Sequence, residues 1–138
     1  EYDNNESGTL AKYYLARAHF NNKDYMAATS YLNEIADASF KLAQFPVSIY
    51  KMLAFISLEN VDHAAAIDYY EQALAKAKVA QQGQNITLDM ADVLLTMGDF
   101  GHSLELVQSV LDEAEPSTPL YNRAEELFGR IEFAQSAG

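Results

Sequence analysis

Apolar side chains recur at three- and four-residue spacing along most of the chain. Leu10 and Tyr14 show this spacing near the start, and Ile49, Leu53 and Ile56 repeat it further on. Such spacing places apolar side chains on one face of a helix. Short polar stretches interrupt the pattern, and helical spacing resumes after each of them. The pattern therefore predicts pairs of helices joined by tight polar turns.

The predicted pairs share a constellation of residues that repeats along the chain. It begins with an apolar residue that is followed directly by a small one. Nine positions after the apolar residue stands an Asp, which is followed directly by an aromatic residue or histidine. A second small residue stands four positions after the Asp. The three copies are Leu15, Ala16, Asp24, Tyr25 and Ala28, then Leu53, Ala54, Asp62, His63 and Ala66, then Met90, Ala91, Asp99, Phe100 and Ser103. The first small residues stand 38 and 37 positions apart, and a further step of 38 predicts a fourth copy at Gly129. A repeat of this length predicts an array of similar structural units.

Each element of the constellation has a physical role in a helix pair. The Asp is placed to accept a hydrogen bond from the free backbone N–H groups of a following helix, so it is a predicted N-cap. The second helices are predicted over 26–35, 64–80 and 104–111. The small residues on either side of the turn would let the two helices approach closely. Each unit is therefore predicted to be a helix hairpin.

This repeated pattern resembles the tetratricopeptide repeat, a helix–turn–helix unit of about 34 residues. The third copy carries the resemblance best, through Ala91, Gly98, Asp99, Phe100 and Pro116, and the second carries it through Ala54, Asp62, Ala66, Ile67, Tyr70, Ala73 and Leu74. The period of 37–38 residues, Ile35 and His63 depart from the family pattern. The extra residues add about one helical turn, which keeps the apolar face in phase.

The resemblance covers about residues 9–135 and implies an all-α fold, a right-handed superhelical stack of helix hairpins with about three and a half repeats. The expected single repeat domain spans 9–138, with units over 9–45, 46–84 and 85–118 and a final half unit over 119–138. Linkers are expected around 40–46 and 81–84, and residues 1–8 form an acidic leader. The last segment either caps the array or marks a chain that continues beyond Gly138.

Composition and charge exclude several classes of protein. The chain has 138 residues, 49% of them apolar, which suits one soluble globular domain. Its formal charge of −11 disfavours binding to nucleic acid and to anionic membrane surfaces, and no apolar run is long enough to insert into a membrane. Because there is no cysteine, disulfides and zinc–thiolate sites are excluded. A cytoplasmic and a periplasmic location fit equally well.

The search for catalytic motifs finds none. The chain lacks the glycine-rich phosphate loops, the zinc-protease motif and the nucleophile elbow. His63 and His102 follow N-cap aspartates of adjacent units, but we interpret both as exposed residues at helix starts rather than metal ligands. We therefore predict no catalytic residue, no cofactor and no metal, and a protein that is not an enzyme.

In the tetratricopeptide family, the first helices of successive units line a concave groove. The matching positions here predict a groove containing Tyr13, Arg17, Phe20, Asn21, Lys51, Phe55, Leu88 and Asp92. Arg17 and Lys51 beside the two phenylalanines suit a partner segment with an acidic and an apolar residue, whereas Asp92 suits a base. We expect Tyr13 to contact the partner and Tyr14 to pack between helices.

The sequence thus predicts an adaptor, a protein–protein interaction module that binds a peptide segment or partner protein in this groove. Two alternatives remain open. In the first alternative the chain is a sensor or regulatory segment of a larger signalling protein. In the second it is a scaffold that forms homo-oligomers through its terminal half repeat.

Overall fold

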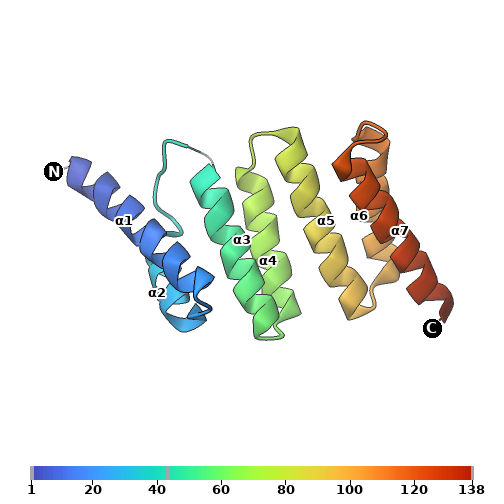
Figure 1. Cartoon of the computed structure of the whole chain (residues 1–138), viewed down its shortest axis with the longest axis horizontal. Coiled ribbons are helices and arrows are strands. Elements are labelled where there is room, and N and C mark those ends of the chain that lie inside the picture. The colour runs from blue at the N-terminus through green and yellow to red at the C-terminus, as the bar shows by residue number, and fades with distance from the viewer. Residues whose placement is uncertain (1, 43, 138) are drawn as a thin grey trace. The chain divides into compact units, whose positions relative to one another are not determined.

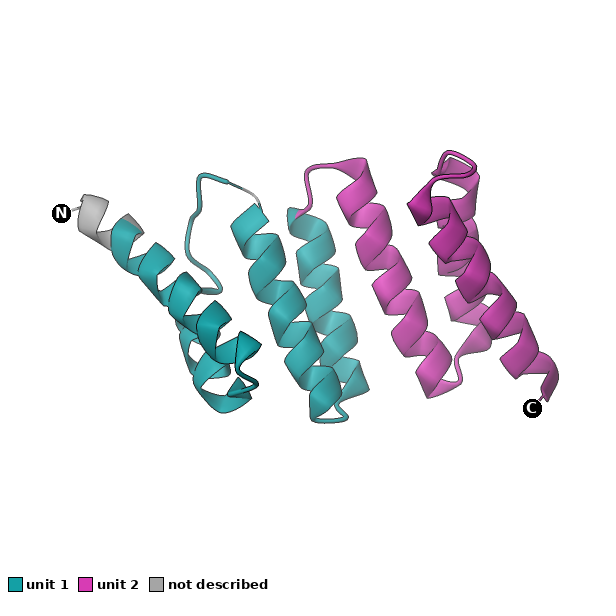
Figure 2. Cartoon of the chain, in the orientation of Figure 1, with its two compact units in different colours: residues 1–76 teal, residues 77–138 magenta. Residues whose placement is uncertain are grey.

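The computed structural model describes residues 2–42 and 44–137, with side chains from Ser7 onward. All regular structure in these residues is helical, as the all-α prediction requires (Figure 1). The helices are α1 (Tyr2–Asn21), α2 (Tyr25–Ile35), α3 (Gln44–Glu59), α4 (His63–Lys76), α5 (Ala80–Met97), α6 (Phe100–Glu113) and α7 (Pro119–Ala137). They form two compact units, residues 1–76 and residues 77–138, which Figure 2 colours separately.

Three turns of the same kind join α1 to α2, α3 to α4 and α5 to α6. In each turn one residue adopts the left-handed conformation, with φ of 63° at Lys23, 59° at Val61 and 83° at Gly98. The N–H of the following aspartate then donates to the carbonyl five residues earlier. These bonds run from Asp24 to His19 at 2.8 Å, from Asp62 to Ser57 at 2.8 Å and from Asp99 to Leu94 at 2.9 Å. This is the Schellman arrangement, which satisfies the last free carbonyls of a helix.

The same aspartates also begin the second helices. Their Oδ1 atoms accept hydrogen bonds from the backbone N–H groups three residues later, at 3.4 Å for Asp24, 3.1 Å for Asp62 and 3.3 Å for Asp99. The predicted N-caps are therefore confirmed. Since one residue closes the first helix and opens the next, only two or three residues separate the helices of each pair.

The predicted close approach of the paired helices is also confirmed. The small residues before and after each turn, Ala16 and Ala28, Ala54 and Ala66, and Ala91 and Ser103, are all fully buried. In the third pair the Ser103 hydroxyl donates to the Ala91 carbonyl at 2.7 Å, which satisfies the one polar side chain of the set. A larger side chain at these positions would push the helices apart.

The predicted fourth copy at Gly129 is wrong. Gly129 is exposed, and the small residue of α7 that is fully buried is Ala124, which stands 33 positions after Ala91. The reason is the starting point of each helix. The helix α7 begins five residues before Ala124, whereas α5 begins eleven residues before Ala91, so the helix is shorter ahead of its small residue.

Four predicted boundaries also differ from the structure. The helix expected over 104–111 spans Phe100–Glu113, and α3 begins at Gln44, within the linker expected around 40–46. The second helix expected over 64–80 ends at Lys76, and the linker expected at 81–84 lies within the first turns of α5. Val79 is extended, and the Gly83 N–H already donates to its carbonyl at 3.1 Å, which starts α5 early. The acidic leader over 1–8 is helical from Tyr2 onward, while the side chains of its first six residues and Gly138 of the last half unit lie outside the described residues.

The left-handed residue at the second turn predicts a simple gain in stability. Val61 is β-branched, 73% exposed and held at positive φ, which costs a residue with a Cβ roughly 1–2 kcal/mol. Val61→Gly removes that strain, and after the entropy of glycine in the unfolded chain it should stabilise the protein by about 0.5–1 kcal/mol in urea unfolding. Val61→Ala, which keeps the strain, is the control, and a loss of stability in Val61→Gly would show that this turn is not left-handed.

The close approach of α3 and α4 predicts a position that cannot accept a large side chain. Ala66→Leu places extra atoms in a fully buried site and should destabilise the chain by roughly 1–3 kcal/mol. Ala64→Leu, at an exposed position of the same helix, should stay within about 0.5 kcal/mol of the parent protein. Equal thermal unfolding of the two variants would contradict the packing.

Candidate functional site

Within the first unit, α1 and α3 bring together most of the residues predicted to form a groove. Tyr13, Arg17 and Phe20 share one face of α1 because they are four and three positions apart. The Tyr13 hydroxyl donates to the Ser48 Oγ on α3 at 2.8 Å, and one end of this face is closed by a ring contact between Phe20 and Phe55 at 5.3 Å. We call the surface formed by Arg17, Phe20, Tyr25, Lys51 and Phe55 the α1–α3 face.

Three aromatic rings gather at one end of the α1–α3 face. The ring centroids of Phe20 and Tyr25 lie 5.6 Å apart, and those of Tyr25 and Phe55 lie 6.1 Å apart. Phe55 is 40% exposed, while Phe20 and Tyr25 are half-buried. Tyr25 was not predicted as a site residue, although its place directly after an N-cap aspartate, beside the end of α1, could have indicated it. The three rings together form a partly exposed apolar surface.

The exposure of Tyr13 and Tyr14 is the reverse of what was predicted, although the Tyr14 ring still lies 6.5 Å from that of Phe45 on α3. Tyr13 is 2% exposed and makes edge contacts with the rings of Tyr14, at 5.2 Å, and Phe45, at 5.0 Å, whereas Tyr14 is 57% exposed. The prediction that Tyr13 contacts a partner with its side chain is therefore wrong. Tyr13 lies three positions before the buried Ala16, and residues three apart share a helix face. The buried face of α1 is thus one position out of phase with the predicted one.

The buried Tyr13 holds Arg17 in place. Arg17 Nη1 donates to the Tyr13 hydroxyl at 3.2 Å, so a chain of hydrogen bonds runs from Arg17 through Tyr13 to Ser48. The Arg17 side chain is exposed, and among the described residues it forms no ion pair. A guanidinium fixed by a neutral hydroxyl keeps its charge uncompensated. On α3 Lys51 lies three positions after Ser48 and four before Phe55, so it shares their helix face, and Asn21 is exposed at the end of α1.

The predicted groove residues of the second unit have internal partners. Leu88 is fully buried in the core of that unit, so the prediction that its side chain faces a binding partner is wrong. Asp92 lies 3.4 Å from the guanidinium of Arg130 on α7. The basic group that was expected from a partner opposite Asp92 is therefore Arg130 of the same chain, because α7 packs beside α5.

A second arginine strengthens the contact between α5 and α7. Arg123 Nη2 lies 2.6 Å from the carboxylate of Asp89, and its Nη1 donates to the carbonyl and the side-chain oxygen of Asn85 at 3.3 and 3.2 Å. These are charge-assisted bonds in a half-buried place, where they are stronger than on an open surface. Two of the three arginines are therefore used to join helices within the second unit.

The histidines lie at the turns. His19 Nδ1 is 3.3 Å from a carboxylate oxygen of Asp24, and His102 Nδ1 is 3.7 Å from one of Asp99. Among the described residues, no group of three or more His, Asp or Glu side chains is placed to hold a metal ion. No helix in the described part of the chain is long and apolar enough to cross a membrane.

The link between α1 and α3 predicts a structural role for the Tyr13 hydroxyl. Tyr13→Phe removes the bonds to Ser48 and Arg17 and should lower the free energy of unfolding by about 1 kcal/mol. Tyr14→Phe, the matched change at the exposed neighbour, should leave that free energy unchanged within error. A destabilisation of Tyr14→Phe that equals that of Tyr13→Phe in urea titrations would overturn this assignment.

Comparison with known proteins adds no relative to this picture. The sequence matches no protein-family model and no curated protein. The resemblance to tetratricopeptide repeats therefore remains a hypothesis that depends on the repeated residues and their three similar turns.

Proposed function

We propose that the chain is a non-enzymatic protein–protein interaction module and that the α1–α3 face binds a segment of its partner. The observation that carries the proposal is the exposed, uncompensated guanidinium of Arg17 next to the cluster of Phe20, Tyr25 and Phe55. Aromatic residues and arginine dominate the binding energy of protein interfaces. Their gathering on one surface is thus the feature that best suits recognition.

Preorganisation supports the same proposal. The hydrogen bonds from Arg17 through Tyr13 to Ser48 hold the guanidinium before any partner arrives, and the edge contacts among the three rings restrict their side chains. Binding to such a surface loses less side-chain entropy than binding to mobile groups. The net charge of the chain is −11, so an arginine without an internal ion pair is also a positive site on an otherwise acidic protein.

The chemistry of the face indicates the chemistry of the partner. Arg17 and Lys51 favour a carboxylate, and the aromatic cluster favours an apolar side chain close to it. The partner segment should therefore carry an acidic residue near a leucine or an aromatic residue. Arginine binds a carboxylate with two parallel hydrogen bonds, which gives orientation as well as affinity.

The finer architecture belongs to the same proposal. Three helix pairs with the same Schellman turn, the same N-cap and the same small residues support an array of tetratricopeptide-like hairpins in a right-handed superhelix. In such an array the first helix of each pair lines the concave surface. The α1–α3 face is formed by two first helices with the start of α2 at its end, as this architecture requires.

Partner binding should depend on the face and not on total charge or exposed apolar area. Proteins captured from an extract of the source organism are identified by mass spectrometry, and their affinities are measured by calorimetry. Arg17→Gln and Phe55→Ala should each lower the affinity for the partner at least tenfold, because each removes a contact group of the face.

The matched controls lie in the same unit but outside the face. Lys76→Gln removes an exposed cation from α4, and Met26→Ala removes an exposed apolar side chain from α2. Both should bind as the parent protein does. A partner that tolerates Arg17→Gln and Phe55→Ala as well as it tolerates these controls would refute the proposed face.

A further inference from the structure

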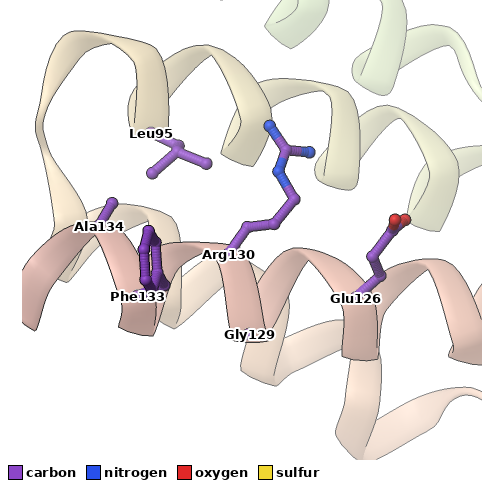
Figure 3. Close-up of a pocket in the computed structure, with 6 residues that line it drawn as sticks. All are labelled: Leu95, Glu126, Gly129, Arg130, Phe133 and Ala134. Atoms are coloured by element: carbon purple, nitrogen blue, oxygen red, sulfur yellow. The ribbon is translucent and has the colours of Figure 1, made fainter.

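The second unit contains a hollow between α5 and α7. It is lined by Leu95 on α5 and by Glu126, Gly129, Arg130, Phe133 and Ala134 on α7, and its volume is about 610 Å³ (Figure 3). Pockets that bind ligands commonly measure roughly 300–1,000 Å³. The hollow is therefore large enough for one or two side chains of a binding partner.

One end of the hollow is apolar. Leu95 is half-buried there, and Phe133 is 75% exposed although it is a large aromatic side chain (Figure 3). Gly129 lies in the same stretch of α7, and a Cβ added to it would meet nothing within 4 Å. Glycine within a helix costs about 1 kcal/mol relative to alanine, and no neighbour requires its small size here. The space that Gly129 leaves open is part of the hollow.

The other end is charged, and its charges are not equally compensated. Arg130 reaches toward α5 (Figure 3). There its guanidinium lies 3.4 Å from the carboxylate of Asp92. Glu126 lines the hollow one turn earlier, and among the described residues it forms no ion pair. Residues 77–138 carry ten acidic and three basic side chains, a net charge of −7. The hollow therefore presents an uncompensated carboxylate within an acidic unit, which attracts cations.

We propose that this hollow is a second binding site, one for a basic amphipathic helix of a partner protein. An apolar side chain of that helix lies between Leu95 and Phe133, and a lysine or arginine of the same helix pairs with Glu126. Glu126 and Phe133 are seven positions apart on α7, which is about 10.5 Å at 1.5 Å per residue. A partner helix lying along α7 matches this length with two residues seven positions apart. This partner is opposite in charge to the one proposed for the α1–α3 face.

The test uses the full chain, labelled with ¹⁵N, and a defined probe. The probe is a capped, alanine- and glutamine-based helical peptide with one leucine and one lysine seven positions apart. Its titration should shift the amide signals of Leu95, Gly129 and Phe133 saturably at up to millimolar concentration. Replacing the lysine of the probe by glutamine should weaken binding about five- to tenfold.

Two variants separate the charged end from the apolar end. Glu126→Gln should lower the affinity for the lysine probe by the same five- to tenfold and leave the affinity for the glutamine probe unchanged. Gly129→Leu should abolish binding of both probes, because the side chain fills the hollow while it favours the helix. The matched controls are Glu125→Gln, beside the hollow on α7, and Gly101→Leu, at an open glycine of α6, and neither should change the affinity.

Other results would overturn the proposal. These are the absence of shifts around the hollow, equal affinity of the two probes, or an unaltered affinity in Glu126→Gln. Sedimentation that shows a dimer of the parent protein but a monomer of Gly129→Leu would assign the hollow to a second copy instead. Arg17→Gln should bind the probe normally, so the outcome is independent of the function proposed for the α1–α3 face.

Discussion

An aspartate that closes one helix and opens the next is the constraint on which the rest of this structure depends. Its backbone N–H completes the Schellman turn, and its carboxylate caps the following helix. With both tasks performed by one residue, the connection is too short to let the helices separate. The second helix must return along the first, and only small residues fit where the two are closest. The fully buried Ala16, Ala54 and Ala91 follow from this geometry.

The same constraint decides which helix faces are left for contacts outside the helix pair. Once one face of a first helix is packed against its second helix, another face is free for contacts with the next first helix in the unit. In the first unit that contact is made by the neutral Tyr13 and Ser48 hydroxyls, which leaves the charge of Arg17 uncompensated. In the second unit aspartates on α5 pair with Arg123 and Arg130 on α7. Similar helix pairs thus leave a cation without an ion pair in one unit and join opposite charges in the other.

The repeated residues made a large part of the fold predictable. The turns, the N-caps and the buried small residues depend on contacts within about twenty residues of sequence, so their spacing is visible in the chain. The phase of α1 was less predictable, because the apolar Leu15 beside Ala16 indicated a buried face that actually belongs to Tyr13. The fourth small residue was missed for a related reason, since the start of α7 does not follow the earlier spacing.

The candidate surfaces were harder to predict than the fold. The pairs Asp89–Arg123 and Asp92–Arg130 join residues more than thirty positions apart, so no local sequence pattern indicates them. The burial of Leu88 and the hollow beside Gly129 arise from the packing of α7 near α5. In the first unit helical spacing alone places Arg17, Phe20 and Phe55 on the faces of α1 and α3 that meet, while their role in binding a partner stays a prediction.

Three turns with different residues share one geometry, which backbone NMR of the full chain can measure. Residual dipolar couplings and carbon chemical shifts report φ at Lys23, Val61 and Gly98, and hydrogen exchange reports the amides of Asp24, Asp62 and Asp99. We expect positive φ at all three positions and slowed exchange at all three aspartates, because each of these amides donates to a carbonyl. Extended φ at Lys23 or Val61, or an aspartate amide that exchanges as fast as an unfolded chain, would contradict it.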